Sequence, residues 1–261
     1  MKTLVLNKKT HASKKPKVIA VVLAYNCARM LPRAYERIPK ELVDDIIVMD
    51  DGSKDNTSEV ARRLGLKVFR HVPNRGYGGN LKEGLRRALA LGADYVVEIH
   101  GDGAQFNPAS IQYALKPMRE RAQLILGSRF REPGKALANG MPLIRFIANR
   151  FLSFFDRIIL GLPLTEFHTG FRIYGKKLLQ RVPWQHNSND YLFSFQIIAQ
   201  AAYFKMPVSE IPVEADYRGE HTSHKLTGAA LYAFQTFGIL AQYLLAKTRI
   251  HTTRIFPVLH S

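Results

Sequence analysis

The sequence predicts an α/β protein whose mostly parallel, doubly wound sheet carries helices on both faces. In the first half of the chain, short runs of β-branched and aromatic residues alternate with stretches of helical periodicity. Four of these runs end in polar or glycine-rich turns. If the strands are parallel, all four turns lie along one edge of the sheet, where α/β proteins bind their ligands.

The first predicted strand, residues 18–24, is apolar throughout, which is typical of a strand buried on both faces. Three further strands follow in the first half, at residues 45–49, 67–69 and 95–99. Helical spacing predicts the connecting helices at residues 31–38, 58–64 and 81–91.

The second half is less regular. We predict a strand at 123–126 and an edge strand at 208–213, because Pro212 offers no N–H to a neighbouring strand. Long helices are predicted at 142–160 and 226–246. The chain then divides into a basic arm, a main domain, and a terminal helix with a basic tail, at residues 1–16, 17–225 and 226–261.

The charge is strongly positive, since 38 Lys and Arg outnumber 21 Asp and Glu and give a formal net charge of +17. Residues 1–17 contain no acid, and none follows Glu220. This balance favours an anionic partner, such as an acidic membrane surface or a phosphorylated substrate. Zinc-finger spacing and RNA-recognition signatures are lacking, so no nucleic-acid partner is predicted.

The single cysteine, Cys27, excludes an internal disulfide and fits a reducing compartment. The lysine-rich start of the chain is not followed by the apolar run of a signal peptide. We therefore expect a cytoplasmic protein.

The turn after the strand at 95–99 is the first candidate site. Gly101 and Gly103 place Asp102 at the end of this strand. Asp102 and the Gln105 carbonyl could supply oxygen ligands to a divalent cation, and His100 could supply a nitrogen. The alternative is that Asp102 caps a helix that begins at Pro108.

The earlier turns suit a nucleotide-sugar. The Asp51 carboxylate can accept hydrogen bonds from a base or a ribose, and Tyr25 can offer a ring or a hydroxyl. The turn at Arg75 and Gly76 can bring backbone N–H groups and a helix N-terminus close to phosphates. Each segment can also be an ordinary turn followed by a helix cap. Neither a P-loop nor a G-x-G-x-x-G pattern is present.

Taken together and in order, these motifs resemble the nucleotide-sugar domain of the family-two glycosyltransferases, which have the GT-A fold. The nearest branch is the one that contains dolichyl-phosphate mannose synthase. The resemblance covers residues 17–225 and rests on Ala24-Tyr25-Asn26, Asp50-Asp51-Gly52-Ser53, the glycine turn from Asn74 to Asn80, His100-Gly101-Asp102 with Gln105, Gly127-Ser128-Arg129, Thr169-Gly170-Phe171-Arg172 and Asp190.

Two departures from the family pattern concern the predicted metal site. His100 stands where the family's D-x-D motif usually has its first acid, and one extra residue separates Asp102 from Gln105. A smaller departure is Ala24, where a proline is usual.

The resemblance implies a set of roles. The nucleoside would be held at Ala24, Tyr25, Asn26 and Asp51. Mg²⁺ or Mn²⁺ would be held against the diphosphate by Asp102, with Gln105 and His100. Gly76, Arg218 and Lys225 would lie at the donor's anionic groups. Arg129 would be a further donor-site residue, in a loop that resembles the family's mobile loop near the acceptor.

Three residues of the second half carry open alternatives. His168 can be a donor-site ligand, an acid–base group or a satisfied polar residue. Arg172 can orient a carboxylate or phosphate in catalysis, or form a buried structural ion pair. Asp190 can be the general base for a hydroxyl acceptor or a helix cap, and a lipid-phosphate acceptor would need no strong base.

Both long helices also have two readings. We expect the apolar stripe of residues 142–160, with Ile144, Ile147, Phe151, Phe155, Ile158 and Ile159, to be a core face rather than a membrane face. The helix at 226–246 is expected to lie on a membrane surface, with packing against the domain as the alternative.

The resemblance implies an inverting glycosyltransferase that moves a sugar from a nucleoside-diphosphate sugar to a polyprenyl phosphate, peripherally at the cytoplasmic membrane face. Alternatives are transfer to a soluble hydroxyl or saccharide acceptor, and a catalytically silent nucleotide-binding scaffold. The sugar, the base and the oligomeric state are left open.

Overall fold

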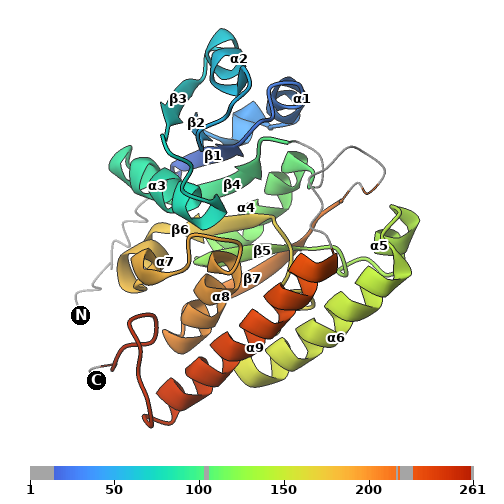
Figure 1. Ribbon diagram of the computed structural model, residues 1–261, viewed down its shortest axis with the longest axis vertical. Helices are drawn as coiled ribbons and strands as arrows, with labels where there is room; N and C mark the ends of the chain where they lie inside the picture. Colours follow the sequence, from blue (N-terminus) through green and yellow to red (C-terminus); the bar gives the residue numbers. More distant parts are fainter. Residues whose placement is uncertain (1–14, 103–105, 216, 218–225, 260–261) are drawn as a thin grey trace, which may run out of the picture.

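The computed structural model describes residues 15–102, 106–215, 217 and 226–259 (Figure 1). Within them a seven-stranded sheet has the order β3-β2-β1-β4-β6-β5-β7. The strands span β1 Val18–Ala24, β2 Asp45–Asp50, β3 Lys67–Arg70, β4 Tyr95–His100, β5 Leu124–Ser128, β6 Arg172–Gly175 and β7 Val208–Pro212. All strands predicted from the sequence are present, and β7 is an edge strand as expected.

The first four strands are parallel and end in register. Ala24 of β1 pairs with Asp50 of β2, and Asp50 in turn pairs with Arg70 of β3. On the other side of β1, Leu23 pairs with His100 of β4. The four turns that follow these strands therefore lie side by side along one edge of the sheet, as the sequence predicts.

The second half of the sheet departs from the parallel pattern because β6 runs antiparallel to both β4 and β5. The strand β6, which has four residues and begins with an arginine, was not predicted from the sequence. Its register places Arg172 opposite Glu98 in the middle of the sheet. The position of β6 thus brings the Thr169–Arg172 motif beside the fourth turn.

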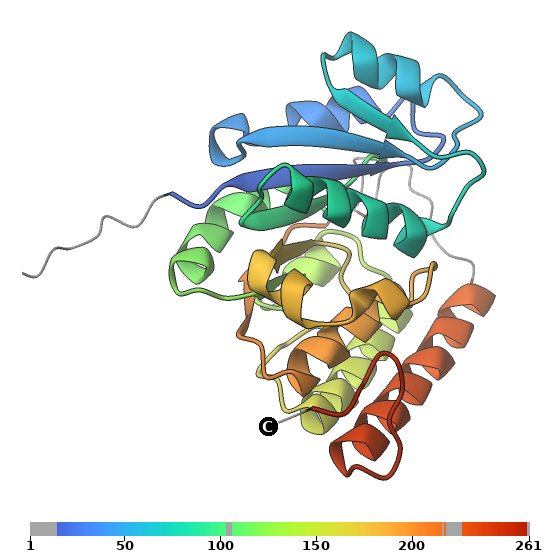
Figure 2. The same cartoon turned by 90° about the vertical axis from the view of Figure 1, so that its left-hand side faces the viewer.

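Helices cover both faces of the sheet (Figures 1 and 2). One face packs against α1, α2 and α4, and the other packs against α3, α7, α8 and α9. The side chains of β1 alternate between the two cores, so every residue of this strand is buried. The helices span α1 Leu31–Glu36, α2 Thr57–Arg63, α3 Tyr77–Ala90, α4 Ile111–Arg119, α5 Lys135–Ala138, α6 Leu143–Leu160, α7 Lys176–Arg181, α8 Phe193–Tyr203 and α9 Leu226–Lys247. Short 3₁₀ helices span Lys40–Leu42, Pro108–Ser110 and Trp184–His186.

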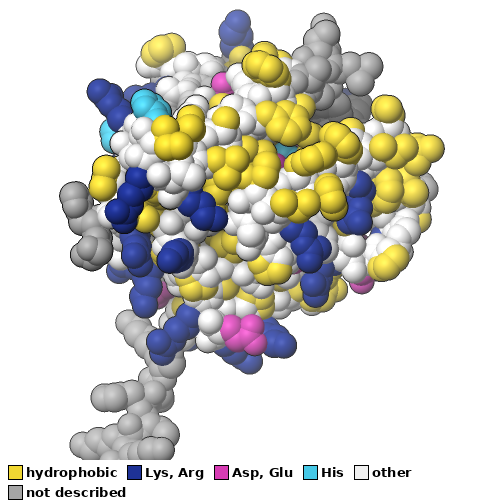
Figure 3. All heavy atoms as spheres, turned by 90° about the horizontal axis from the view of Figure 1, so that it is seen from below, with side chains coloured by type: hydrophobic (Ala, Val, Ile, Leu, Met, Phe, Trp, Pro, Cys, Tyr) yellow, Lys and Arg dark blue, Asp and Glu magenta, His cyan; other side chains and the backbone are white. Residues whose placement is uncertain are grey.

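The prediction for α6 is wrong, because its apolar stripe faces outward. Ile144, Ile147, Phe151 and Ile158 are each more than half exposed. The buried residues of this helix include two polar ones, Ser153 and Asp156, which hydrogen-bond the chain near residue 167. Leu160 is buried with them and Ile159 packs against the core, so polar and apolar contacts together attach the helix to the domain. Figure 3, which views the molecule from below relative to Figure 1, shows hydrophobic side chains gathered over one half of the visible surface.

The terminal helix α9 packs against α6 and α8. One side of it is buried through Ile239, Leu240, Tyr243 and Ala246. The opposite side exposes Leu231, Phe234 and Phe237. The helix therefore packs against the domain on one side, which was the alternative for this segment, and exposes apolar side chains on the other.

Candidate active site

The first two turns of the aligned edge are joined by hydrogen bonds. The backbone N–H of Asn26 donates to the Ser53 hydroxyl over 2.9 Å, and the Lys54 N–H donates to the Asn26 side chain over 2.7 Å. Asn26 adopts a left-handed backbone, with φ at 48°, which asparagine tolerates better than most residues. Ala24, the last residue of β1, is buried, whereas Tyr25 is half exposed and Asn26 is exposed.

The second turn is tied to the third through Asp51. Its Oδ1 accepts the Arg75 backbone N–H over 2.8 Å, and its carbonyl accepts the Asn74 side-chain amide over 2.8 Å. The Nδ1 atom of buried His71 lies 3.5 Å from the same Asp51 Oδ1. His71 was not predicted from the sequence as a site residue, although its place directly after β3 was a signal. The carboxylate predicted to meet the nucleoside therefore also shapes the glycine turn.

The third turn packs against the segment that contains Asp190. A Cβ atom at Gly76 would lie 2.5 Å from the Asn189 carbonyl oxygen, and one at Gly78 would lie 2.5 Å from the Ser188 carbonyl oxygen. Gly76 also has φ at 79°, so a side chain there would be strained as well as crowded. These glycines allow a loop that lies 110 residues or so further along the chain to close on the turn.

Asp190 is exposed and belongs to this loop. Its Oδ1 accepts the Leu192 backbone N–H over 2.9 Å and the Ser188 hydroxyl over 2.7 Å. The helix predicted to open at Asp190 begins at Phe193, so Asp190 stabilises the turn before α8 rather than the first turn of the helix itself.

The fourth turn carries Asp102, which is partly exposed. The 3₁₀ helix at Pro108 is capped by Asn107, whose side chain accepts the Ala109 N–H over 3.1 Å. Asp102 is therefore not the cap of that helix, which was the structural alternative for it. Gln105 lies outside the described residues.

Beneath this turn His100 is held by a buried acid. Its Nε2 lies 3.2 Å from Oε1 of Glu98, which is fully buried in β4. Burial opposes a charge on His100, but the hydrogen bond and the negative charge of Glu98 outweigh burial and raise the pKa of His100.

Glu98 is the centre of a buried polar cluster. The Tyr77 hydroxyl donates to Oε1 of Glu98, and the Tyr174 hydroxyl donates to Oε2 over 2.6 Å. Burial would raise the pKa of Glu98, but the hydrogen bond from His100 and the charge of Arg172 lower it. Arg172 itself is only 2% exposed. An acid in the mostly apolar strand β4 was a visible signal for this cluster, but Glu98 was not predicted from the sequence as a site residue.

Two further polar pairs hold the segment before β6. His168 Nε2 lies 2.8 Å from Oδ2 of Asp156 on α6, and His168 stacks on Phe195 of α8. Its Nδ1 lies 3.5 Å from the Tyr232 hydroxyl on α9. This geometry agrees with His168 as a satisfied polar residue, and it ties both long helices to the site.

Arg129, predicted to be a donor-site residue, is paired inside the protein. Its Nε and its backbone N–H each donate to the Glu166 carboxylate over 2.7 Å, and its Nη1 donates to the Tyr217 hydroxyl. Arg129 is 4% exposed and Glu166 is fully buried. Because the partners lie far apart in the sequence, no local pattern could have identified the pair.

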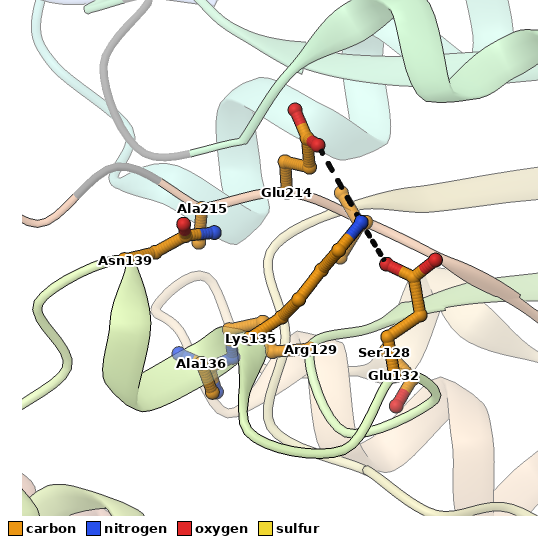
Figure 4. Close-up of a pocket in the computed structure, with 9 residues that line it drawn as sticks. Ser128, Arg129, Glu132, Lys135, Ala136, Asn139, Glu214 and Ala215 are labelled. Carbon is orange, nitrogen blue, oxygen red and sulfur yellow. Dashed lines mark ion pairs between the residues drawn. The ribbon is translucent and has the colours of Figure 1, made fainter.

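A small pocket lies at the carboxyl ends of β5 and β7 (Figure 4). Lys135 of α5 extends into it, with its Nζ 2.6 Å from Glu132 and 4.0 Å from Glu214. Arg218 and Lys225, the cations expected to follow β7, lie outside the described residues.

A match between the sequence and a family model shows to which family the chain belongs. Residues 19–182, more than half of the chain, match the family model of Glycosyl transferase family 2. The chain belongs to glycosyl transferase family 2.

Two relatives confirm the branch that the sequence resembles. A UDP-N-acetylglucosamine–dolichyl-phosphate N-acetylglucosaminyltransferase from Methanococcus voltae is 29% identical over 218 residues, which cover 77% of this chain and 86% of the relative. An undecaprenyl-phosphate mannosyltransferase from Micrococcus luteus is 28% identical over 244 residues, which cover 90% and 99%.

The fold is confirmed by solved structures of glucosyl-3-phosphoglycerate synthase from Mycobacterium tuberculosis. The form solved with Mn²⁺, UDP-glucose and glycerol 3-phosphate matches with a TM-score of 0.63 and 19% identity, over 88% of this transferase and 80% of that chain. At this level of identity the similarity shows the shared GT-A architecture.

The transferase contains no group of three His, Cys, Asp or Glu side chains placed to hold a metal ion, as far as its described residues go. The donor set near Asp102 is one carboxylate beside a histidine that already faces Glu98. Mg²⁺ is commonly bound by one or two carboxylates together with substrate phosphates. These residues therefore fit a cation that arrives with a diphosphate, not a cage made of protein alone.

The buried Arg129–Glu166 pair gives a prediction for stability. Replacing Glu166 by Ala leaves an uncompensated guanidinium in the interior, and we expect the free energy of unfolding to fall by about 3–5 kcal/mol. Urea denaturation measures the change. Substituting the exposed partner of Lys116, Glu120→Ala, is the control and should alter stability little. A Glu166→Ala protein as stable as the wild type would contradict a compensating role for this carboxylate.

Proposed function

We propose that this family 2 transferase moves a sugar from a nucleoside-diphosphate sugar to a polyprenyl phosphate, with inversion at the anomeric carbon. The observation that carries the proposal is the row of four aligned turns, which places Asp51 and Asp102 on one edge of the sheet. The acceptor class is supported by the two relatives, whose names specify dolichyl phosphate and undecaprenyl phosphate.

The donor would lie across the turns from the nucleoside to the diphosphate. Tyr25 and Asn26 offer an exposed ring and amide at the end of β1, and Asp51 offers a carboxylate beside them. The N-terminus of α3, which begins directly after Gly76, offers a partial positive charge, while the N–H groups of Arg75, Gly76 and Gly79 already donate inside the protein. The groups at each turn therefore suit a different part of a bound nucleotide.

Asp102 would hold Mg²⁺ or Mn²⁺ against the diphosphate, with Gln105 and His100 as the other predicted contacts. Such a cation stabilises the negative charge that grows on the leaving nucleoside diphosphate. Arg218 and Lys225 would add positive charge at the same place. The solved structures with Mn²⁺ and UDP-glucose support a divalent cation in this fold.

In the reaction, an acceptor phosphate oxygen attacks the anomeric carbon from the face opposite the leaving group. The bond from that carbon to the diphosphate oxygen breaks, and its electron pair leaves with the nucleoside diphosphate. Because the attacking oxygen is already an anion, no general base is required. Asp190 would then position groups at the acceptor side of the site.

The proposal places the enzyme at the cytoplasmic face of a membrane, where a lipid-phosphate acceptor is presented. Among the helices of the described residues, none has both the length and the apolar character needed to cross a bilayer. Attachment at the surface is therefore the form of membrane association that we propose.

The role of Asp102 predicts that Asp102→Asn lowers the rate of sugar transfer by about 10²–10³-fold, because charge stabilisation at the diphosphate is lost. Thermal stability should stay unchanged, since Asp102 is partly exposed at a turn. Transfer of radiolabelled sugar to polyprenyl phosphate measures the rate, with Glu120→Gln as a surface control. Full activity of Asp102→Asn would remove Asp102 from the mechanism.

Asp190 distinguishes the acceptor classes. Asn keeps an oxygen for the hydrogen bonds from Leu192 and Ser188, so Asp190→Asn should fold normally. With a polyprenyl-phosphate acceptor we expect kcat/KM to stay within about tenfold of the wild type, whereas loss of a general base costs about 10²–10⁴-fold. The larger loss, together with turnover of a soluble hydroxyl acceptor, would favour the alternative function.

A further inference from the structure

The outer face of α6 is an exposed apolar stripe. Ile144, Ile147, Phe151, Phe154 and Ile158 are spaced three and four residues apart, so they lie in one row along the helix. Their exposed fractions are 70%, 54%, 58%, 59% and 62%. Large apolar side chains in such a row mark an interaction surface rather than chance exposure.

The outer face of α9 continues this surface. The two helices are in contact, and Figures 1 and 2 place them together at the end of the molecule opposite α1 and α2. Leu231, Phe234 and Phe237 are exposed on α9, with Phe234 the most exposed at 78%. We call the exposed apolar residues of α6 and α9 the α6–α9 face.

The charges at this face have one sign. The sequence of α6 holds three arginines and a single acid, Asp156, which is buried against His168. Arg150 and Arg157 are exposed beside the apolar row. No acid occurs in α9 or after it, and Lys247 and Arg249 follow at its end. An apolar stripe bordered by cations complements an anionic lipid surface.

A second copy of the chain fits this face less well. An isologous dimer would bring the same patch of both copies together, and the arginines would meet arginines without carboxylates from α6 or α9 to pair with. Lipid phosphates supply that missing negative charge while the acyl chains cover the apolar row.

We propose that the α6–α9 face docks the protein on an anionic bilayer, with its apolar side chains inserted at the level of the headgroups. On the inner side of the same helices, Asp156 and Tyr232 contact His168, two residues before Gly170 at the fourth turn. The bilayer then lies about one helix diameter, roughly 10 Å, from this segment. The presentation of a lipid phosphate to the site rests on the proposed function. Docking itself is inferred only from the exposed apolar residues and the charges of the α6–α9 face.

The test is co-sedimentation of the full chain with vesicles of phosphatidylcholine and phosphatidylglycerol in equal parts, against vesicles of phosphatidylcholine alone. We expect stronger binding to the anionic vesicles. Replacing Phe151 and Phe154 together by Gln should weaken it by at least about tenfold, because two exposed aromatic rings no longer enter the bilayer. The variant Arg150→Gln/Arg157→Gln should weaken binding to the anionic vesicles only.

Tyr113→Gln is the matched control, because Tyr113 on α4 is an aromatic residue of similar exposure, 51%, outside the face. It should bind vesicles like the wild type, while circular dichroism confirms that all variants fold. Unchanged binding of Phe151→Gln/Phe154→Gln would overturn the proposal. So would a concentration-dependent dimer that this variant abolishes while its vesicle binding remains.

A transfer assay with a short-chain, water-soluble polyprenyl phosphate separates this inference from the proposed function. Phe151→Gln/Phe154→Gln should keep wild-type turnover with that acceptor and lose it with acceptor embedded in vesicles. If the wild type binds vesicles but transfers no sugar to either acceptor, the docking surface stands and the proposed function fails.

Discussion

The register of four parallel strands is the constraint on which the rest of the structure depends. Backbone hydrogen bonds align Ala24, Asp50 and Arg70 at the ends of β1, β2 and β3, and His100 of β4 ends beside Leu23. Because parallel strands have the same direction, each of the four turns begins at the same edge of the sheet. A shift of one strand by one residue would reverse its buried side chains and also misplace its turn. Core packing therefore fixes the geometry of the site.

Buried charge then fixes the second half of the sheet against the first. Glu98 of β4 and Arg172 of β6 lie opposite each other, and two tyrosine hydroxyls satisfy the carboxylate. A carboxylate in this position is tolerable only with such partners, because burial of an isolated charge is costly. The charge of Arg172 on the neighbouring strand lowers the pKa of Glu98, so the antiparallel strand beside β4 contributes to this compensation.

The sequence was sufficient for the parallel half and for the turns that follow it. Residues 18–24 alternate between two cores, and an apolar run of this kind has few other solutions. It was insufficient where long-range pairing decides. The partners of Arg129 and His168, Glu166 and Asp156, lie 37 and 12 residues away in the sequence, and β6 is too short for periodicity.

The failure for α6 has a specific physical cause. Its apolar periodicity is real, but hydrophobic periodicity reports that one face is apolar and not what covers it. The inner face of the helix instead carries Ser153, which accepts the Phe167 N–H, and Asp156, which pairs with His168, together with the buried Leu160. The hydrophobic stripe is thereby left available at the surface, where the charge distribution of the whole chain favours an anionic partner.

Binding of a nucleoside diphosphate by the aligned turns can be measured by thermal unfolding with a panel of nucleoside diphosphates, each with and without Mn²⁺. A ligand that binds only the folded protein stabilises it by mass action, by about 2.7 kcal/mol when its concentration is one hundred times Kd. We expect a rise in Tm with one nucleotide, larger when Mn²⁺ is present. An unchanged Tm across the whole panel would contradict it.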